Sequence, residues 1–293
     1  MRSYNPKEWW KIVLDFHKSD TLRKLLPVLI AVGVYAFCIA FIEKHYVDSE
    51  HKTLIKGLSI IHTLLGFVIS LLLVFRTNTA YDRWWEGRKL WGSLVNNSRN
   101  LSIKLNSLLE ADDKNSKSFF AALISRFAFE LKKHLQSADA RYALDQFEHP
   151  EIPDFDRFRH VPEQVVGTMI ERLMQMQRQG RISAEQMLFI NPELTSFMDI
   201  CGGCERIRNT PIPFSYSSFI KKFILFYTLA LPIGYSLSLG YLIIPVVVFV
   251  FYALASLELI AEEVEEPFGS DENDLPMDKL VETINKNVTA ILS

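Results

Sequence analysis

Long uncharged apolar runs alternate with polar stretches along this chain. Residues 25–42 and 57–75 carry no charged side chain, and residues 223–257 form a third run of this kind. A helix needs about 20 apolar residues to cross a bilayer, so each of the first two runs predicts one span and the longer third run predicts two. Proline and glycine residues interrupt the third run, and we expect its tight loop near residues 236–241.

The middle of the chain has no long apolar run, but its apolar residues recur at helical spacing. Residues 107–136 show this spacing most clearly. A later helical stretch stops at Gly180, and Ser183 with Gln186 forms a capping box that starts the next helix. Strand-like alternation is nearly absent. We therefore expect an all-α integral membrane protein with four transmembrane helices and a large helical cytosolic domain.

The predicted organisation has five parts. Residues 1–24 form an amphipathic, aromatic interfacial helix, 25–75 the first transmembrane pair, 76–218 the helical cytosolic domain, 219–260 the second transmembrane pair, and 261–293 a cytosolic C-terminal tail. Lysine and arginine gather at the predicted inner ends of the spans. The positive-inside rule therefore predicts a multi-pass protein of the inner (plasma) membrane with both termini in the cytoplasm.

Composition narrows the class of protein. A hydrophobic fraction of 49% and a net charge of −2 fit a protein that is partly embedded in lipid and argue against nucleic-acid binding. Three cysteines do not predict a disulfide scaffold. Cys201 and Cys204 form a C-x-x-C pair, which suits a redox pair or half of a zinc site. Because no further ligand motif accompanies the pair, we favour a glycine-rich turn with small buried thiols.

Three segments resemble the bestrophin family of ion channels, in its bacterial branch. They are FRTNTAYDRWWEGRKLWG (75–92), GGCERIRNTPIPFSY (202–216) and IAEEVEEPFGSDENDLP (260–276), and they stand in the family's order relative to the spans. The resemblance implies an all-helical protomer, with five protomers around one pore. It also implies a hydrophobic neck lined by the second transmembrane helix and a second constriction in the cytosolic part.

Matching the family's neck to this chain selects Phe67, Leu71 and Phe75. Their spacing of four residues places them on one helix face, and five copies would form three apolar rings that gate by dewetting. The alternative is that these residues face lipid or neighbouring helices. Spacing alone does not exclude that alternative, because every face of this helix is apolar.

Other candidate site residues lie outside the neck. The cytosolic constriction of the family maps near Glu185, where related chains carry an apolar residue; a ring of carboxylates there would favour cations. Glu185 also suits an ordinary first helical turn. His62, inside the second span, is a candidate for the outer vestibule or for a hydrogen bond between helices.

The tail carries a candidate calcium site by resemblance. Asp271 and Asp274 match the first and last aspartates of an acidic cluster that binds calcium in animal bestrophins. Asn273 interrupts the run, and a solvated turn is the alternative interpretation.

The leading hypothesis is a homopentameric channel, not an enzyme, whose partners are its own copies, the lipid bilayer and small monovalent ions. The family indicates chloride, whereas Glu185 and the lack of pore cations favour sodium or potassium. A membrane-anchored redox protein using Cys201 and Cys204, and a membrane scaffold without transport, are the alternatives.

Overall fold

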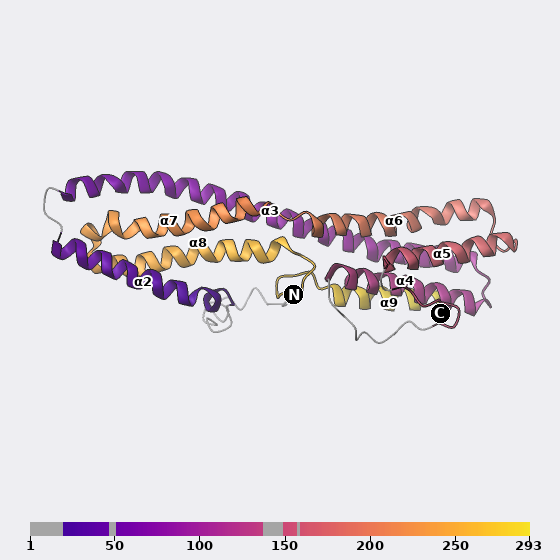
Figure 1. Cartoon of the computed structure of the whole chain (residues 1–293). Helices are drawn as coiled ribbons and strands as arrows, with labels where there is room; N and C mark the ends of the chain where they lie inside the picture. Colours follow the sequence, from indigo (N-terminus) through magenta and orange to yellow (C-terminus); the bar gives the residue numbers. More distant parts are fainter. Residues whose placement is uncertain (1–19, 47–50, 137–148, 157–158) are drawn as a thin grey trace. The chain divides into compact units, whose positions relative to one another are not determined.

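The computed structural model describes residues 20–46, 51–136, 149–156 and 159–293, and every regular element among them is helical (Figure 1). The elements are α2 (Asp20–Tyr46), α3 (His51–Leu108), α4 (Lys114–Gln136), α5 (Val161–Arg178), α6 (Ala184–Asn209), α7 (Phe214–Leu239), the short 3-10 helix η3 (Gly240–Leu242), α8 (Ile243–Glu265) and α9 (Met277–Leu292). The helical fold expected from the sequence is confirmed. Most of the predicted interfacial helix, residues 1–19, lies outside the described residues.

The chain forms two compact units. The first, which we call the membrane unit, contains the described residues up to Asp82 together with Ile212–Glu265. The second, which we call the polar unit, contains Arg83–Pro211 and Glu266–Ser293. Of the segment expected as a separate tail, residues 261–265 complete α8 and the part from Glu266 onward belongs to the polar unit, where α9 packs its apolar face on α4.

The membrane unit packs α2, α7, α8 and the first part of α3 around one apolar core (Figure 1). Leu29, Val32, Ala36 and Ala40 recur at helical spacing and form the buried face of α2. The opposite face of α2 is also apolar but exposed. Helices that are apolar all round are typical of a membrane environment.

Three helical stretches of the described chain are long and apolar enough to cross a membrane. They are Thr21–Tyr46, Ile60–Leu108 and Phe214–Glu265. The third contains α7 and α8, with η3 between them at the place where the tight loop was expected. Gly240 has a positive φ of 55°, a backbone conformation that glycine adopts without the steric cost of a side chain.

Two helices continue beyond the apolar runs that predicted them. α2 extends past Ile42, where the first apolar run ends, to Tyr46. α3 passes through Arg76 without a break and ends only at Leu108. The change to polar residues at Arg76 had suggested the end of a span. It marks a change of surroundings and not the end of a helix, since no proline interrupts residues 76–108.

The polar unit is a helical bundle with a core of its own. Phe127 of α4 and Phe197 of α6 meet edge to face at its centre, with ring centroids 4.7 Å apart. The predicted helix boundaries are confirmed here: Ser183 and Gln186 form the capping box of α6, and Gly180, with a φ of 73°, follows the end of α5. The expected turn at Cys201–Cys204 is wrong, because both cysteines lie inside α6.

Candidate functional site

The apolar residues that the resemblance assigns to a neck lie together on an exposed side of α3. Phe67, Leu71 and Phe75 are 68%, 46% and 56% exposed in the single chain. Ile69 and Leu73 of the same helix are buried in the core of the membrane unit. The described helices of the chain therefore do not cover Phe67, Leu71 and Phe75. In a membrane such a face meets lipid, a pore or another copy of the chain.

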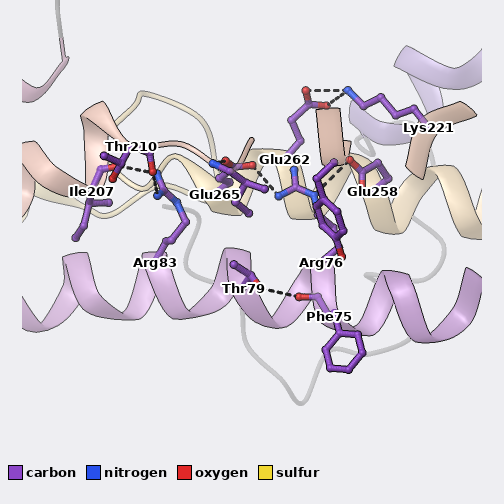
Figure 2. Close-up of polar contacts among 12 residues, drawn as sticks. Phe75, Arg76, Thr79, Arg83, Ile207, Thr210, Lys221, Glu258, Glu262 and Glu265 are labelled. Atoms are coloured by element: carbon purple, nitrogen blue, oxygen red, sulfur yellow. Dashed lines mark hydrogen bonds and ion pairs between the residues drawn. The ribbon is translucent and has the colours of Figure 1, made fainter. Parts of the chain in front are cut away.

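The residue after Phe75 points to the other side of the helix. Arg76 is 1% exposed and lies against α8, where its Nε is 3.4 Å from Oε1 of Glu258 and its Nη1 is 2.7 Å from Oε2 of Glu265 (Figure 2). Glu258 is buried as well, and its Oε2 has no hydrogen-bond partner among the described residues. Arg76 thus joins α3 to α8 through charges held out of water, and its own charge is compensated.

The same end of α8 carries two further polar contacts. Glu265 also accepts a hydrogen bond from the backbone N–H of Ile212 at 2.6 Å, at the entry to α7. Lys221 of α7 pairs with Glu262 of α8 at 2.8 Å, but both side chains are about half exposed, at 48% and 49%. The buried contact of Arg76 and the exposed pair of Lys221 are therefore neighbours that differ mainly in their access to water.

The polar unit has its own arginine anchor on α3. Arg83 donates to the backbone carbonyls of Ile207 and Thr210, at 2.6 and 2.5 Å, where α6 ends (Figure 2). The last carbonyls of a helix have no partner within the helix, so a cation placed there is favourable. Glu86, one turn along α3, pairs with Arg206 of α6.

His62 lies on the covered side of α3. Its ring is 6% exposed and stacks on Tyr227 of α7, with ring centroids 4.0 Å apart, while Tyr235 meets it edge-on at 5.9 Å. This is a stacking contact between helices, and Nε2 of His62 has no hydrogen-bond partner among the described residues, so the hydrogen bond between helices is not seen; the outer vestibule stays a prediction. His62 is separated in this way from the exposed residues Phe67, Leu71 and Phe75.

Glu185 lies in the first turn of α6 and is exposed. Ser183 Oγ donates to its Oε2 at 2.7 Å. This hydrogen bond, together with one from the backbone N–H of Glu185, holds the pKa of the carboxyl below its usual range. The side chain is therefore fully ionised at neutral pH. Leu188 and Phe189, one turn further along α6, are 73% and 53% exposed, so this helix end also presents apolar surface.

The acidic turn before α9 is folded tightly on itself. Asp274 is 2% exposed, and its Oδ2 accepts the backbone N–H of Asp271 at 2.5 Å. Burial, with the nearby charges of Asp271 and Glu266, raises the pKa of Asp274 to about 6, against the effect of that hydrogen bond. Trp84 of α3 donates to the carbonyl of Asn273 at 3.0 Å, so the turn is fastened to α3 inside the polar unit.

A cluster that the sequence did not predict lies around Glu205 of α6. Its Oε1 is 2.6 Å from Nε2 of His134, at the end of α4, and 2.7 Å from Nε2 of His160, just before α5. Burial alone would raise the pKa of Glu205, but the hydrogen bonds and charge of His160 and His134 lower it. These residues come from three separated segments, and no local motif links them.

The buried thiols of α6 lie beside this cluster. Cys201 Sγ is 3.9 Å from Nε2 of His160. Burial, reinforced by the charges of Glu205 and Glu163, raises the pKa of Cys201 to about 12, and burial raises that of Cys204 further. Neither thiol forms a disulfide. Thiols that stay protonated are poor nucleophiles, which argues against redox chemistry by this pair.

The model of the bacterial and fungal bestrophin proteins matches residues 1–290 of the chain. The chain belongs to the bestrophin family. Among its relatives, a voltage-dependent anion channel-forming protein of Nostoc sp. is 37% identical over 78% of this chain and 76% of its own length. A protein of the same description from Ralstonia nicotianae is 33% identical over 93% of this chain and 88% of its own length.

The fold is also that of a solved bestrophin. The structure of a bacterial bestrophin homolog from Klebsiella pneumoniae superposes with a TM-score of 0.78, at 24% identity, over 91% of this chain and 98% of that chain. Together with the apolar helices, family membership makes this bestrophin a membrane protein and supports ion transport as its class of activity.

The acidic turn does not fit calcium well among the described residues of this bestrophin. Ca²⁺ takes about six to eight oxygen ligands. Asp274 offers one buried oxygen without a hydrogen-bond partner, Oδ1, whereas its Oδ2 is used inside the turn. The carbonyl of Gly269 accepts from Gln136, as that of Asn273 does from Trp84. One free oxygen of Asp274 does not make a calcium site by itself, so no calcium-dependent step follows, and calcium binding by Asp271 and Asp274 stays a prediction.

Proposed function

We propose that this bestrophin is one protomer of a homopentameric channel that carries small monovalent anions, chloride foremost, across the bacterial plasma membrane. The basic residues that flank the spans support a cytoplasmic location for both termini and for the polar unit. The names of the relatives from Nostoc and Ralstonia, which are anion channel-forming proteins, support anions over cations.

The observation that carries the proposal is the uncovered apolar face of α3. Phe67, Leu71 and Phe75 follow each other at about 6 Å along the helix axis. In a ring of five protomers they would form three stacked apolar rings. Water leaves a narrow apolar constriction readily, so such rings close the path for ions without a plug. The alternative that this face meets only lipid is decided by the experiment below.

The orientation of Arg76 supports the same arrangement. A cation directly after Phe75 would hold an anion at the inner mouth of the neck if it pointed toward the pore. Figure 2 shows Arg76 turned toward Glu258 and Glu265 on α8, away from Phe75. The neck is therefore an apolar barrier without a fixed charge of its own, in keeping with gating by dewetting.

The test is ion flux through purified protein in liposomes and planar bilayers, with chloride and sodium gradients applied separately. We expect chloride flux. Leu71→Ala should raise the open probability or the conductance, because it widens the middle ring and lowers its apolar surface. Leu26→Ala is the matched control, since Leu26 of α2 is 50% exposed, close to the 46% of Leu71, but lies on another helix.

The possible outcomes distinguish a scaffold from a channel, a cation channel from an anion channel, and a pore-lining face from a lipid-facing one. No flux for either ion would favour a membrane scaffold and overturn the channel. Sodium flux in preference to chloride would support the channel function but overturn the choice of chloride. It would then favour Glu185 as a residue that selects cations. Equal effects of Leu71→Ala and Leu26→Ala would show that the face of Leu71 meets lipid and does not form the neck.

A further inference from the structure

We propose that His134, His160, Glu205 and Cys201 form a binding site for one divalent transition metal ion of the zinc class in the polar unit. The site goes beyond the proposed channel activity and does not depend on it. Nitrogen, thiolate and carboxylate donors are the set that Zn²⁺ takes in proteins, whereas Ca²⁺ and Mg²⁺ prefer oxygen alone.

The donor atoms already converge. One ligand atom each from His134, His160 and Glu205 lies within 4.8 Å of the others, and all three side chains are partly buried. Oε1 of Glu205 is 2.6 and 2.7 Å from the two imidazole nitrogens. Ligands of a tetrahedral zinc stand about 3.4 Å apart, so the cluster opens by less than about 1 Å to admit an ion.

Cys201 supplies the fourth ligand from the same helix as Glu205. Its Sγ is 3.9 Å from Nε2 of His160. A sulfur and a nitrogen bound to one tetrahedral zinc are about 3.6 Å apart, so this pair needs only a small approach. Cys201 precedes Glu205 by four residues, one turn of α6, and therefore reaches the same side of the helix.

Metal binding changes the protonation of His160 and Cys201. Nδ1 of His160 accepts the backbone N–H of Glu163 at 3.2 Å, so in the neutral ring the proton is on Nε2 and is donated to Glu205. Binding of a metal at Nε2 moves that proton to Nδ1 and so ends the hydrogen bond that Nδ1 accepts from the backbone N–H of Glu163. The protonated Nδ1 can then donate a hydrogen bond to Oε2 of Glu163, which is 3.9 Å away. This gives the carboxylate–histidine–metal arrangement of many zinc sites. Cys201, which is protonated without a metal, would release its thiol proton to solvent when the ion binds, because a bound cation deprotonates a coordinating thiol.

An ion held in this way joins three elements of the polar unit. His134 closes α4, His160 caps the start of α5, and Glu205 with Cys201 belongs to the second half of α6. A ligand that binds only the folded protein stabilises it in proportion to the logarithm of its concentration over Kd. Zinc should therefore raise the melting temperature of the wild-type protein.

The test uses the full-length protein in detergent, without a histidine tag and freed of metals with a chelator. Calorimetric titration with Zn²⁺ should give one ion per chain. His134→Gln and His160→Gln should each weaken the affinity for Zn²⁺ at least about tenfold. Losing a residue that only hydrogen-bonds to a metal ligand already costs about that much, and losing a ligand itself should cost more. His149→Gln is the matched control, because His149 lies in the same unit but contacts Phe119 and Ser118 instead.

A second measurement begins with the wild-type protein, whose result does not depend on the folding of any variant. Co²⁺ bound to the wild-type protein should give the strong visible absorption of a tetrahedral site and a thiolate charge-transfer band in the near ultraviolet. Cys201→Ser should abolish only the charge-transfer band. The proposal is overturned if the wild-type protein binds no zinc, or if its Co²⁺ spectrum is that of an octahedral ion without thiolate. Equal losses in His149→Gln and the ligand variants would also overturn it.

Discussion

Replacing Arg76 by methionine tests how the membrane unit is held together directly beside the proposed neck. Methionine keeps most of the length and volume of the arginine stem but removes the guanidinium. Arg76→Met therefore leaves the carboxylate of Glu258 buried without its cation, and that of Glu265 with the Ile212 backbone N–H as a remaining partner.

The size of the effect follows from burial. The side chains of Arg76, Glu258 and Glu265 are 1%, 3% and 12% exposed, so almost no water compensates the two carboxylates for the loss of the guanidinium. Removing one partner of a buried ion pair costs about 3–5 kcal/mol. That is a large part of the roughly 5–15 kcal/mol that stabilises a typical folded domain. At about 2–4 °C per kcal/mol, the melting temperature should fall by roughly 10 °C.

The assay is thermal unfolding of the purified protein in one detergent, followed by circular dichroism. Lys221→Met is the matched control, because it also removes a cation that faces α8 but leaves Glu262 about half exposed to water. An exposed pair contributes about 0–1 kcal/mol, so this control should lose no more than about 4 °C. Similar losses in Arg76→Met and Lys221→Met would refute the reasoning.

A rescue experiment separates charge from packing. Adding Glu258→Gln to Arg76→Met removes the charge of the buried Glu258 carboxylate and should restore part of the lost melting temperature. The two substitutions are therefore expected to be non-additive, as for residues in contact. If the double variant is less stable than Arg76→Met by the full cost of Glu258→Gln alone, the two side chains are not coupled.

Two further predictions concern carboxylates of the polar unit. Glu185→Gln should shift the reversal potential in a salt gradient toward that of chloride, because it removes an ionised group that repels anions; an unchanged potential would place Glu185 away from the ion path. Asp113 caps α4 through the N–H of Ser116 and pairs with Arg181. Burial would raise the pKa of Asp113, but these hydrogen bonds and the charge of Arg181 lower it. The pair of Asp113 and Arg181 thus stabilises the folded protein at pH values above about 3.9, the pKa of an aspartate in the unfolded chain. This stabilisation is lost as the pH falls through the lower pKa that Asp113 has in the folded protein. Asp113→Asn keeps the cap but should lower the melting temperature slightly at pH 7, and the difference should vanish in acid; a constant difference would contradict the assignment.

Features that depend on neighbours in the sequence were predicted correctly. The capping box of α6 and the glycine after α5 are local, because each involves residues within one helical turn. The apolar runs also found the membrane helices, since the bilayer imposes a length on every span. The three bestrophin segments are continuous in the sequence as well, so the family could be recognised from them alone.

Features that depend on contacts across the chain could not be predicted. His134, His160 and Glu205 converge only when α4, α5 and α6 pack together. The sequence around Cys201 and Cys204 therefore showed no further residues that could bind a metal with them. The position of these thiols inside a helix was missed because two glycines suggested a turn, whereas packing keeps the segment helical. Gly203 lies where a side chain would meet Leu90, 3.1 Å from its methyl groups, so close helix packing accounts for that glycine.

The proposed neck ends where one face of α3 changes its chemistry, and Arg76 is not the residue that marks that end. Arg76 lies on the buried face with Ile69 and Leu73, and its charge is compensated by α8. On the exposed face the side chains change from apolar to polar between Phe75 and Asn78, both of which are exposed. A helix that continues unbroken through this point keeps both faces in register. A movement of α8 that pulls on Arg76 would therefore also displace Phe75, the preceding residue on the same turn, and would couple the ionic anchor to the proposed neck.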